Sequence, residues 1–141
     1  MILRHFGITV TNIEKSIEFY RDVLGFEVSR IMDESGDHID AFSNLKEVKV
    51  KTVKMKDPNG GMIELLQYFS HPETANFDSI CRVGCSHFAM TVQSLDATIV
   101  KILHAGYSIN CQPQYSPDGN VKLTFAKGPD GVLIELVEEL R

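Results

Sequence analysis

The chain has 141 residues and a formal net charge of −5, because 19 Asp and Glu residues outnumber 14 Lys and Arg residues. Hydrophobic residues make up 43% and charged residues 23%, which is typical of globular proteins and excludes disordered and collagen-like classes. A chain of this length is expected to form one core. The acidic balance and the lack of a basic run disfavour a nucleic-acid function and favour small-molecule partners.

No apolar run approaches the roughly 20 residues that a membrane helix needs, and Met1 leads into a strand pattern without a signal sequence. We therefore predict a cytoplasmic protein. The cysteines are Cys81, Cys85 and Cys111, an odd number without Cys-x-x-Cys spacing. This pattern argues against a disulfide framework and a zinc ribbon, and we expect reduced, mostly buried thiols. A metal site of Cys81, Cys85 and His87 is a less favoured alternative.

The first half of the chain predicts a strand, a helix and three further strands. Residues 4–10 alternate between apolar and other residues, as a half-buried strand does. Asn12 can cap a helix that extends from Ile13 to Leu24, and Gly25 ends it. The β-branched and aromatic stretches that follow predict strands, with a tight turn before the last one; they are 26–28, 48–55, the turn 58–61, and 62–66.

The second half repeats this plan. His5-Phe-Gly-Ile-Thr-Val returns 82 residues later as His87-Phe-Ala-Met-Thr-Val, and the segment that ends in Glu64 returns 71 residues later with Glu135. Ser94 can cap a second helix, and Gly106 ends it. The strands and turn that follow are 107–109, 121–126, the turn 129–131, and 133–137. The chain is therefore predicted to be one α+β domain, 1–141, of two tandem βαβββ modules, with module one at 1–66, a linker at 67–84 and module two at 85–141.

Each module contributes one histidine and one glutamate at matching positions, namely His5, Glu64, His87 and Glu135. A lone strand histidine is usually structural, and a lone glutamate usually faces solvent. Both glutamates, however, interrupt aliphatic strands, where an unpaired charge is costly. Two imidazoles and two carboxylates suit a divalent cation, so we predict one four-ligand metal site. A metal-free descendant or a plain polar-lined pocket is the alternative.

Other polar residues could serve the same chemistry, but a structural or surface function is favoured for each. A separate base could be Glu34, Asp40 or Glu47, and His38 with Asp40 forms a polar cluster that could shape a pocket. An anionic substrate could meet Arg4, Arg30 or Lys122. Neither His71 nor His104 has a repeat partner, so neither is expected to bind metal.

These motifs resemble the vicinal oxygen chelate superfamily, which includes glyoxalase I, methylmalonyl-CoA epimerase, extradiol dioxygenases and the fosfomycin- and bleomycin-resistance proteins. The resemblance covers essentially the whole chain. It lies in the segments that begin at His5, at Ser16 (Ser-Ile-Glu-Phe-Tyr-Arg-Asp-Val-Leu-Gly-Phe), at His87 and at Gly128 (Gly-Pro-Asp-Gly-Val-Leu-Ile-Glu-Leu). It implies a cupped, curved mixed β-sheet with helices outside. It also implies that His5, Glu64, His87 and Glu135 hold Ni, Zn, Co, Mn or Fe, with open positions for two substrate oxygens.

The presence of Glu64 favours one branch of the superfamily. By the resemblance, ring-cleaving dioxygenases lack a carboxylate at this place, whereas the glyoxalase I and epimerase types have Glu or Gln there. We therefore expect a lyase or isomerase, lactoylglutathione lyase-like or methylmalonyl-CoA epimerase-like, that transfers a proton next to a carbonyl through a metal-bound enediolate. Glu135 or Glu64 would be the catalytic base. The alternatives are an Fe(II)-dependent dioxygenase and a metal-free binding or resistance protein.

A homodimer is expected, and the two modules could pair within one chain or swap between chains.

Overall fold

A computed structural model describes residues 1–76 and 79–141 of the chain. The chain divides into two compact units, Met1–Ala75 and Asn76–Arg141, and each contains one mixed β-sheet and a helix that follows its first strand. This confirms the predicted α+β class with two βαβββ-like modules. Residues 77 and 78, which belong to the predicted linker 67–84, lie outside the described residues. Among the described residues, every helix is too short or too polar to cross a membrane.

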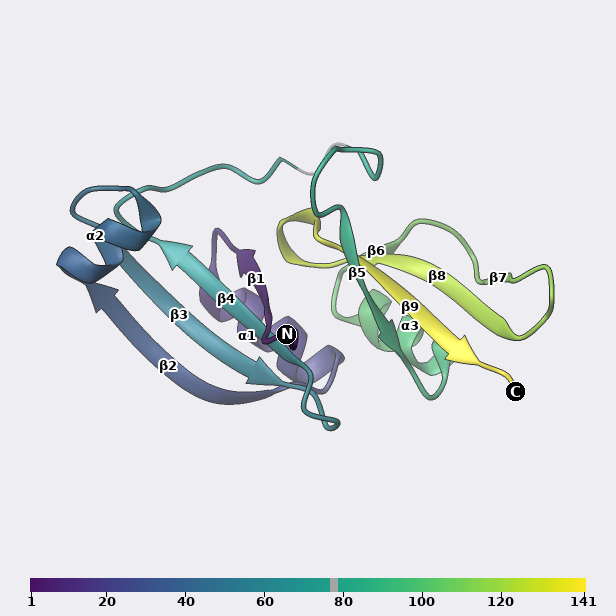
Figure 1. The fold of residues 1–141 in the computed structure, drawn as a ribbon. Coiled ribbons are helices and arrows are strands. Elements are labelled where there is room, and N and C mark those ends of the chain that lie inside the picture. Colours follow the sequence, from purple (N-terminus) through teal and green to yellow (C-terminus); the bar gives the residue numbers. More distant parts are fainter. Residues whose placement is uncertain (77–78) are drawn as a thin grey trace. The chain divides into compact units, whose positions relative to one another are not determined.

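The first unit is a four-stranded sheet in the order β1-β4-β3-β2 (Figure 1). Strand β1 is parallel to β4, and the other pairs are antiparallel. The helix α1 lies behind β1 and β4 in Figure 1, and its first turn is capped by the Asn12 side chain, which accepts a hydrogen bond from the Lys15 amide. The elements are β1 (Phe6–Thr9), α1 (Ile13–Glu18), η1 (Phe19–Val23), β2 (Glu27–Ser35), α2 (Asp37–Ser43), β3 (Lys49–Lys56) and β4 (Met62–Tyr68).

The second unit repeats the arrangement in the order β5-β9-β8-β6, with β7 also paired to β8. Here β5 is parallel to β9, as β1 is to β4. The Ser94 side chain caps α3 by accepting a hydrogen bond from the Ala97 amide. The elements are β5 (His87–Thr91), α3 (Leu95–His104), β6 (Ser108–Ile109), β7 (Gln114–Tyr115), β8 (Val121–Lys127), the 3-10 turn η2 (Pro129–Gly131) and β9 (Leu133–Glu139).

Each final hairpin closes through a turn that needs the left-handed backbone region. Gly60 has a φ of 91°, and Asp130 has a φ of 58°. Glycine has no Cβ, and Asp tolerates this region better than most residues, which explains why these residue types stand there. Both predicted turns are therefore confirmed, and they fix the register of β3 with β4 and of β8 with β9.

The last strand of each unit divides its side chains between two faces. In β4, Ile63 and Leu65 are buried, as Ile134 and Leu136 are in β9. Since neighbouring side chains along a strand point to opposite faces, the glutamate between each pair lies on the other face. The first face belongs to the core, and the opposite face carries the glutamate together with apolar neighbours, such as Leu66 in β4 and the buried Leu133 in β9.

The helix α2 packs on one end of the first sheet. Ile39 lies in a cluster with Val48 and Val50, and Leu66 and Tyr68 pack against it. Asp40 stabilises the loop after this helix, because its carboxylate oxygens accept hydrogen bonds from the amides of Glu47 and Val48 at 2.9 Å each.

Three sequence expectations differ from the structure. The helix from Ile13 to Leu24 is α-helical only to Glu18 and continues as a π-helix to Val23. The segment after Val28 is a strand through Ser35, and α2 was not expected at all. The expectation of mostly buried thiols is wrong, because all three cysteines are exposed and lie in irregular segments outside the buried strand faces.

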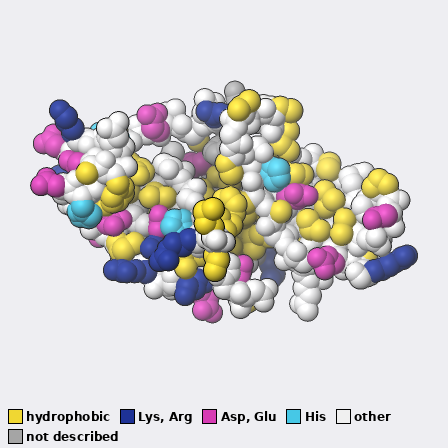
Figure 2. Space-filling model, viewed as in Figure 1, with side chains coloured by type: hydrophobic (Ala, Val, Ile, Leu, Met, Phe, Trp, Pro, Cys, Tyr) yellow, Lys and Arg dark blue, Asp and Glu magenta, His cyan; other side chains and the backbone are white. Residues whose placement is uncertain are grey.

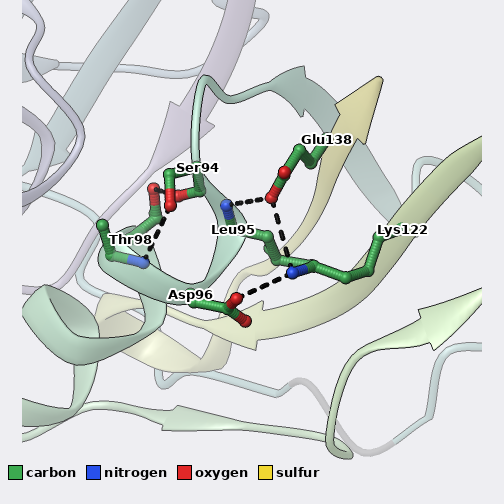
Figure 3. Close-up of polar contacts among 7 residues, drawn as sticks. Ser94, Leu95, Asp96, Thr98, Lys122 and Glu138 are labelled. Atoms are coloured by element: carbon green, nitrogen blue, oxygen red, sulfur yellow. Dashed lines mark hydrogen bonds and ion pairs between the residues drawn. The ribbon is translucent and has the colours of Figure 1, made fainter. Parts of the chain in front are cut away.

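A side chain from the last strand of each sheet accepts a hydrogen bond from the first residue of α1 or α3. In the second unit the Leu95 amide donates to Glu138 Oε2 at 2.6 Å, and Lys122 Nζ lies 3.6 Å from the same carboxylate and 2.8 Å from Asp96 Oδ2 (Figure 3). In the first unit Gln67 takes the equivalent place. Its Oε1 accepts from the Ile13 amide at 2.8 Å, and its Nε2 donates to the Thr11 carbonyl.

Replacing Glu138 by Ala should destabilise the protein by about 1–2 kcal/mol, because the Leu95 amide at the helix start loses its acceptor. Glu138→Gln should cost less, since the amide oxygen can still accept that hydrogen bond, as Gln67 does in the first unit. Urea unfolding followed by circular dichroism would measure both. The control is Glu139→Ala, an exposed residue at the end of the same strand, for which little change is expected. Equal losses for Glu138→Ala and Glu139→Ala would contradict the capping function.

The contribution of Lys122 to stability should depend on alkaline pH. Its hydrogen bond with Asp96 raises the pKa of Lys122 above its ordinary value, and the nearby Glu138 carboxylate acts in the same direction. A raised folded-state pKa stabilises the fold fully below the unfolded-state pKa of about 10.4 and loses this effect as the pH rises through the folded-state pKa. The melting temperature of the wild type should therefore exceed that of Lys122→Met by a constant margin up to about pH 10 and by a shrinking margin above it. A margin that stays constant to pH 11 would count against the ion pair.

Candidate functional site

In the first unit the parallel pairing of β1 and β4 brings His5 and Glu64 together. Gly7 is the register partner of Glu64, and His5 precedes Gly7 by two residues, so both side chains lie on the same face. His5 Nε2 is 3.5 Å from Glu64 Oε1. The segment between His5 and Glu64 forms α1, β2, α2 and β3. The pairing of β1 with β4 therefore brings together two residues that lie far apart in the sequence.

The second unit forms the same pair from β5 and β9. Ala89 is the register partner of Glu135, and His87 precedes it by two residues. His87 Nε2 is 3.5 Å from Glu135 Oε2, the same distance as in the first unit. The sequence repeat is therefore also a geometric repeat, including the separation of the imidazole nitrogen and the carboxylate oxygen.

These separations fit two ligands of one metal ion better than a hydrogen bond. A hydrogen bond between nitrogen and oxygen is about 2.7–3.2 Å long, so the 3.5 Å between Nε2 and the carboxylate oxygen is outside that range. Metal-to-ligand bonds of about 2.0–2.2 Å place neighbouring ligand atoms about 3.0–3.5 Å apart. Among the described residues, neither Glu64 nor Glu135 accepts a hydrogen bond, and their side chains are only 15% and 26% exposed. Partly buried carboxylates suit a neighbouring cation, and at Glu64 the Lys54 ammonium, 3.7 Å from Oε2, already acts as one.

The two histidines differ in the hydrogen bonding of their Nδ1 atoms. His87 Nδ1 is 2.8 Å from Ser86 Oγ, a hydrogen bond that orients the ring and leaves Nε2 toward Glu135. His5 Nδ1 is buried and has no hydrogen-bond partner in the part of the chain that the structure describes. Partners of this kind position metal-binding histidines in many proteins, so the second pair is the more firmly oriented one.

The neighbours of the two glutamates also differ. Lys54, the register partner of Glu64 on β3, places its Nζ 3.7 Å from Glu64 Oε2. The equivalent residue on β8 is Phe125, the partner of Glu135, and its ring meets the His87 ring edge-on with centroids 5.1 Å apart. Sequence reasoning missed both residues, although the spacing of 71 residues that relates Glu64 to Glu135 also relates Lys54 to Phe125.

The predicted ligands are thus brought together as two pairs, one in each unit. Within residues 1–76 and 79–141, no three His, Cys, Asp or Glu side chains form one group that could hold a metal ion. This also holds for the alternative of Cys81 and Cys85 with His87. A single centre built from both pairs remains a prediction.

The other sequence candidates have structural contacts or stand apart. Glu34 accepts a hydrogen bond from Thr52, and Lys122 is held by Asp96 and Glu138, as described above. His38 lies in α2 against the Phe42 ring, and His71 is hydrogen bonded to Ser70. The remaining ones are exposed and form no ion pair with either His–Glu pair among the described residues, namely Arg4, Arg30, Glu47 and His104.

A profile of the Glyoxalase/Bleomycin resistance protein/Dioxygenase superfamily matches residues 2–136. The chain belongs to this superfamily. It is 30% identical over 139 residues to a probable lactoylglutathione lyase of Synechocystis sp., covering 98% of this chain and 95% of that protein. It is 27% identical over 139 residues to the uncharacterised protein YaeR of Escherichia coli, covering 97% and 95%.

Solved structures of the glyoxalase family share the fold. A glyoxalase family protein from Bacillus cereus superposes with a TM-score of 0.90 at 22% identity, covering 99% of this chain and 94% of that one. The trypanothione-dependent glyoxalase I of Leishmania major gives 0.68 at 22% identity, covering 96% and 84%. These likenesses support the vicinal oxygen chelate fold, and the chemistry of this chain has to be argued from its own residues.

Proposed function

We propose that this superfamily member is a metal-dependent lyase or isomerase of the glyoxalase type, which transfers a proton next to a carbonyl. The observation that carries the proposal is the repeated His–Glu pair, with Nε2 and the carboxylate oxygen 3.5 Å apart in each unit. We further propose that His5, Glu64, His87 and Glu135 together hold one divalent ion. The name of the Synechocystis relative, a probable lactoylglutathione lyase, supports this class of reaction.

In this proposal the bound metal and the carboxylates have different functions in the reaction. When bound, a divalent metal would act as a Lewis acid and favour negative charge on the two substrate oxygens. One carboxylate, Glu135 or Glu64, removes the proton next to the carbonyl and returns it to the neighbouring position. The ring of Phe125 lies edge-on to the His87 ring and provides an apolar neighbour for the second pair.

Protein purified without added metal should contain a divalent ion, measured by elemental analysis, and one ion is expected for each set of four ligands. His5→Ala, His87→Ala and Glu135→Ala should each lose most of it, because a ligand is removed. The control is His104→Ala, at the end of α3, which should retain the metal.

Turnover separates the candidate reactions. A screen of hemithioacetals, acyl-CoA esters and catechols should find isomerisation of one of the first two, and Glu64→Gln should change metal affinity or turnover. Oxygen uptake with a catechol and full activity of Glu64→Gln would instead identify a ring-cleaving dioxygenase. Tight ligand binding by protein that takes up no metal after reconstitution would identify a sequestration protein.

The hydrogen bond between Ser86 and His87 offers a finer test of the metal proposal. Ser86→Ala should weaken metal affinity by roughly 10- to 100-fold, because the His87 ring loses the partner that orients it. Competition with a metal-binding dye would measure the change. Ser108→Ala, an exposed serine in β6, is the matched control. An unchanged affinity in Ser86→Ala would mean that this hydrogen bond does not position His87 for metal binding.

Mixing two inactive variants would show which chains supply each site in the proposed homodimer. One variant lacks His5 and Glu64, and the other lacks His87 and Glu135. If each site combines pairs from different chains, a mixed dimer regains one intact site and binds metal again. If both pairs belong to the same chain, mixing restores nothing.

A further inference from the structure

A row of charged residues crosses the first sheet beside the candidate site. Glu64 on β4 is the register partner of Lys54 on β3, and Lys54 is the register partner of Arg30 on β2. Register partners on adjacent strands carry their side chains on the same face. The face that bears the His5–Glu64 pair therefore also bears Lys54 and Arg30, in the order carboxylate, ammonium and guanidinium.

This row has one more positive charge than negative charge. Lys54 is already close to Glu64, with Nζ 3.7 Å from Oε2. Arg30 makes no ion pair with any described residue, and it stands directly opposite Lys54. Like charges directly opposite each other destabilise a strand pair unless something neutralises them. Figure 2, which views the face turned away from α1, shows Lys and Arg side chains gathered beside a histidine over the first unit.

The second unit provides an internal comparison for this row. Phe125 occupies the place of Lys54, and the β8–β9 pairing is the same as the β3–β4 pairing. The fold therefore accepts an aromatic residue at this position and does not require a cation. The lysine side chain is also only 21% exposed, so this position places a cationic side chain in a partly buried part of the face.

We propose that Lys54 and Arg30 bind an anionic group of the substrate, a carboxylate or a phosphate, next to the carbonyl that is processed at the His5–Glu64 pair. A guanidinium can hold two oxygens of such a group, and an ammonium adds a point charge. This inference rests on the proposed function. It goes further by assigning a charge to the substrate and by placing the residues that recognise it in the first unit alone.

Binding of glutathione and of coenzyme A, measured by calorimetry on the full chain, would test the proposal. Glutathione presents carboxylates and coenzyme A presents phosphates, so the probe that binds identifies the source of the anion. Lys54→Phe copies the residue of the second unit and should preserve the fold. It should weaken binding of that probe by about tenfold or more, as should Arg30→Met, and added salt should weaken wild-type binding.

The matched control is Lys49→Met, an exposed lysine whose position on β3 places it on the opposite face of the sheet. It should bind as the wild type does, and Arg30→Lys should recover part of the affinity lost in Arg30→Met. Wild type that binds neither probe would overturn the proposal, and so would Lys54→Phe that binds as tightly as Lys49→Met. Metal content reports on the proposed function separately, because Lys54→Phe should keep the metal and lose only the anion.

Discussion

The candidate site depends on one backbone constraint, the parallel pairing of the first and last strands of each sheet. This pairing sets Gly7 beside Glu64 and Ala89 beside Glu135, and it brings the preceding histidine within 3.5 Å of the carboxylate in both units. Parallel strands need a long connection, and the intervening helix and hairpin provide it. The geometry of each His–Glu pair is thus set by the pairing of the first and last strands of its sheet.

Local sequence patterns predicted most of what forms this contact. Alternation marked β1 and β4, Asn12 and Ser94 marked the helix starts, and the glycine-containing turns marked the hairpins. Each of these signals is short-range, so it can be recognised without knowing the tertiary structure. The repeat then identified the His–Glu pairs, because the same spacing recurs in both halves.

The features that were missed depend on tertiary contacts. The strand β2 continues through charged residues because it pairs with β3, and α2 forms because Ile39 can be buried against Val48 and Val50. The sequence contains no recognised local signal for the π-helical end of the first helix. Neither the contact of Lys54 with Glu64 nor that of Phe125 with His87 follows from either residue alone, since both arise from cross-strand register.

The capping residues Gln67 and Glu138 follow the candidate ligands Glu64 and Glu135 by three positions on the same strands. Displacing either strand by one residue would release the start of its helix and turn the carboxylate into the apolar core at the same time. The loss of the helix cap and the burial of a carboxylate therefore both disfavour the same shift in strand register. The geometry of each candidate His–Glu pair therefore depends on a hydrogen bond on the other face of the same strand.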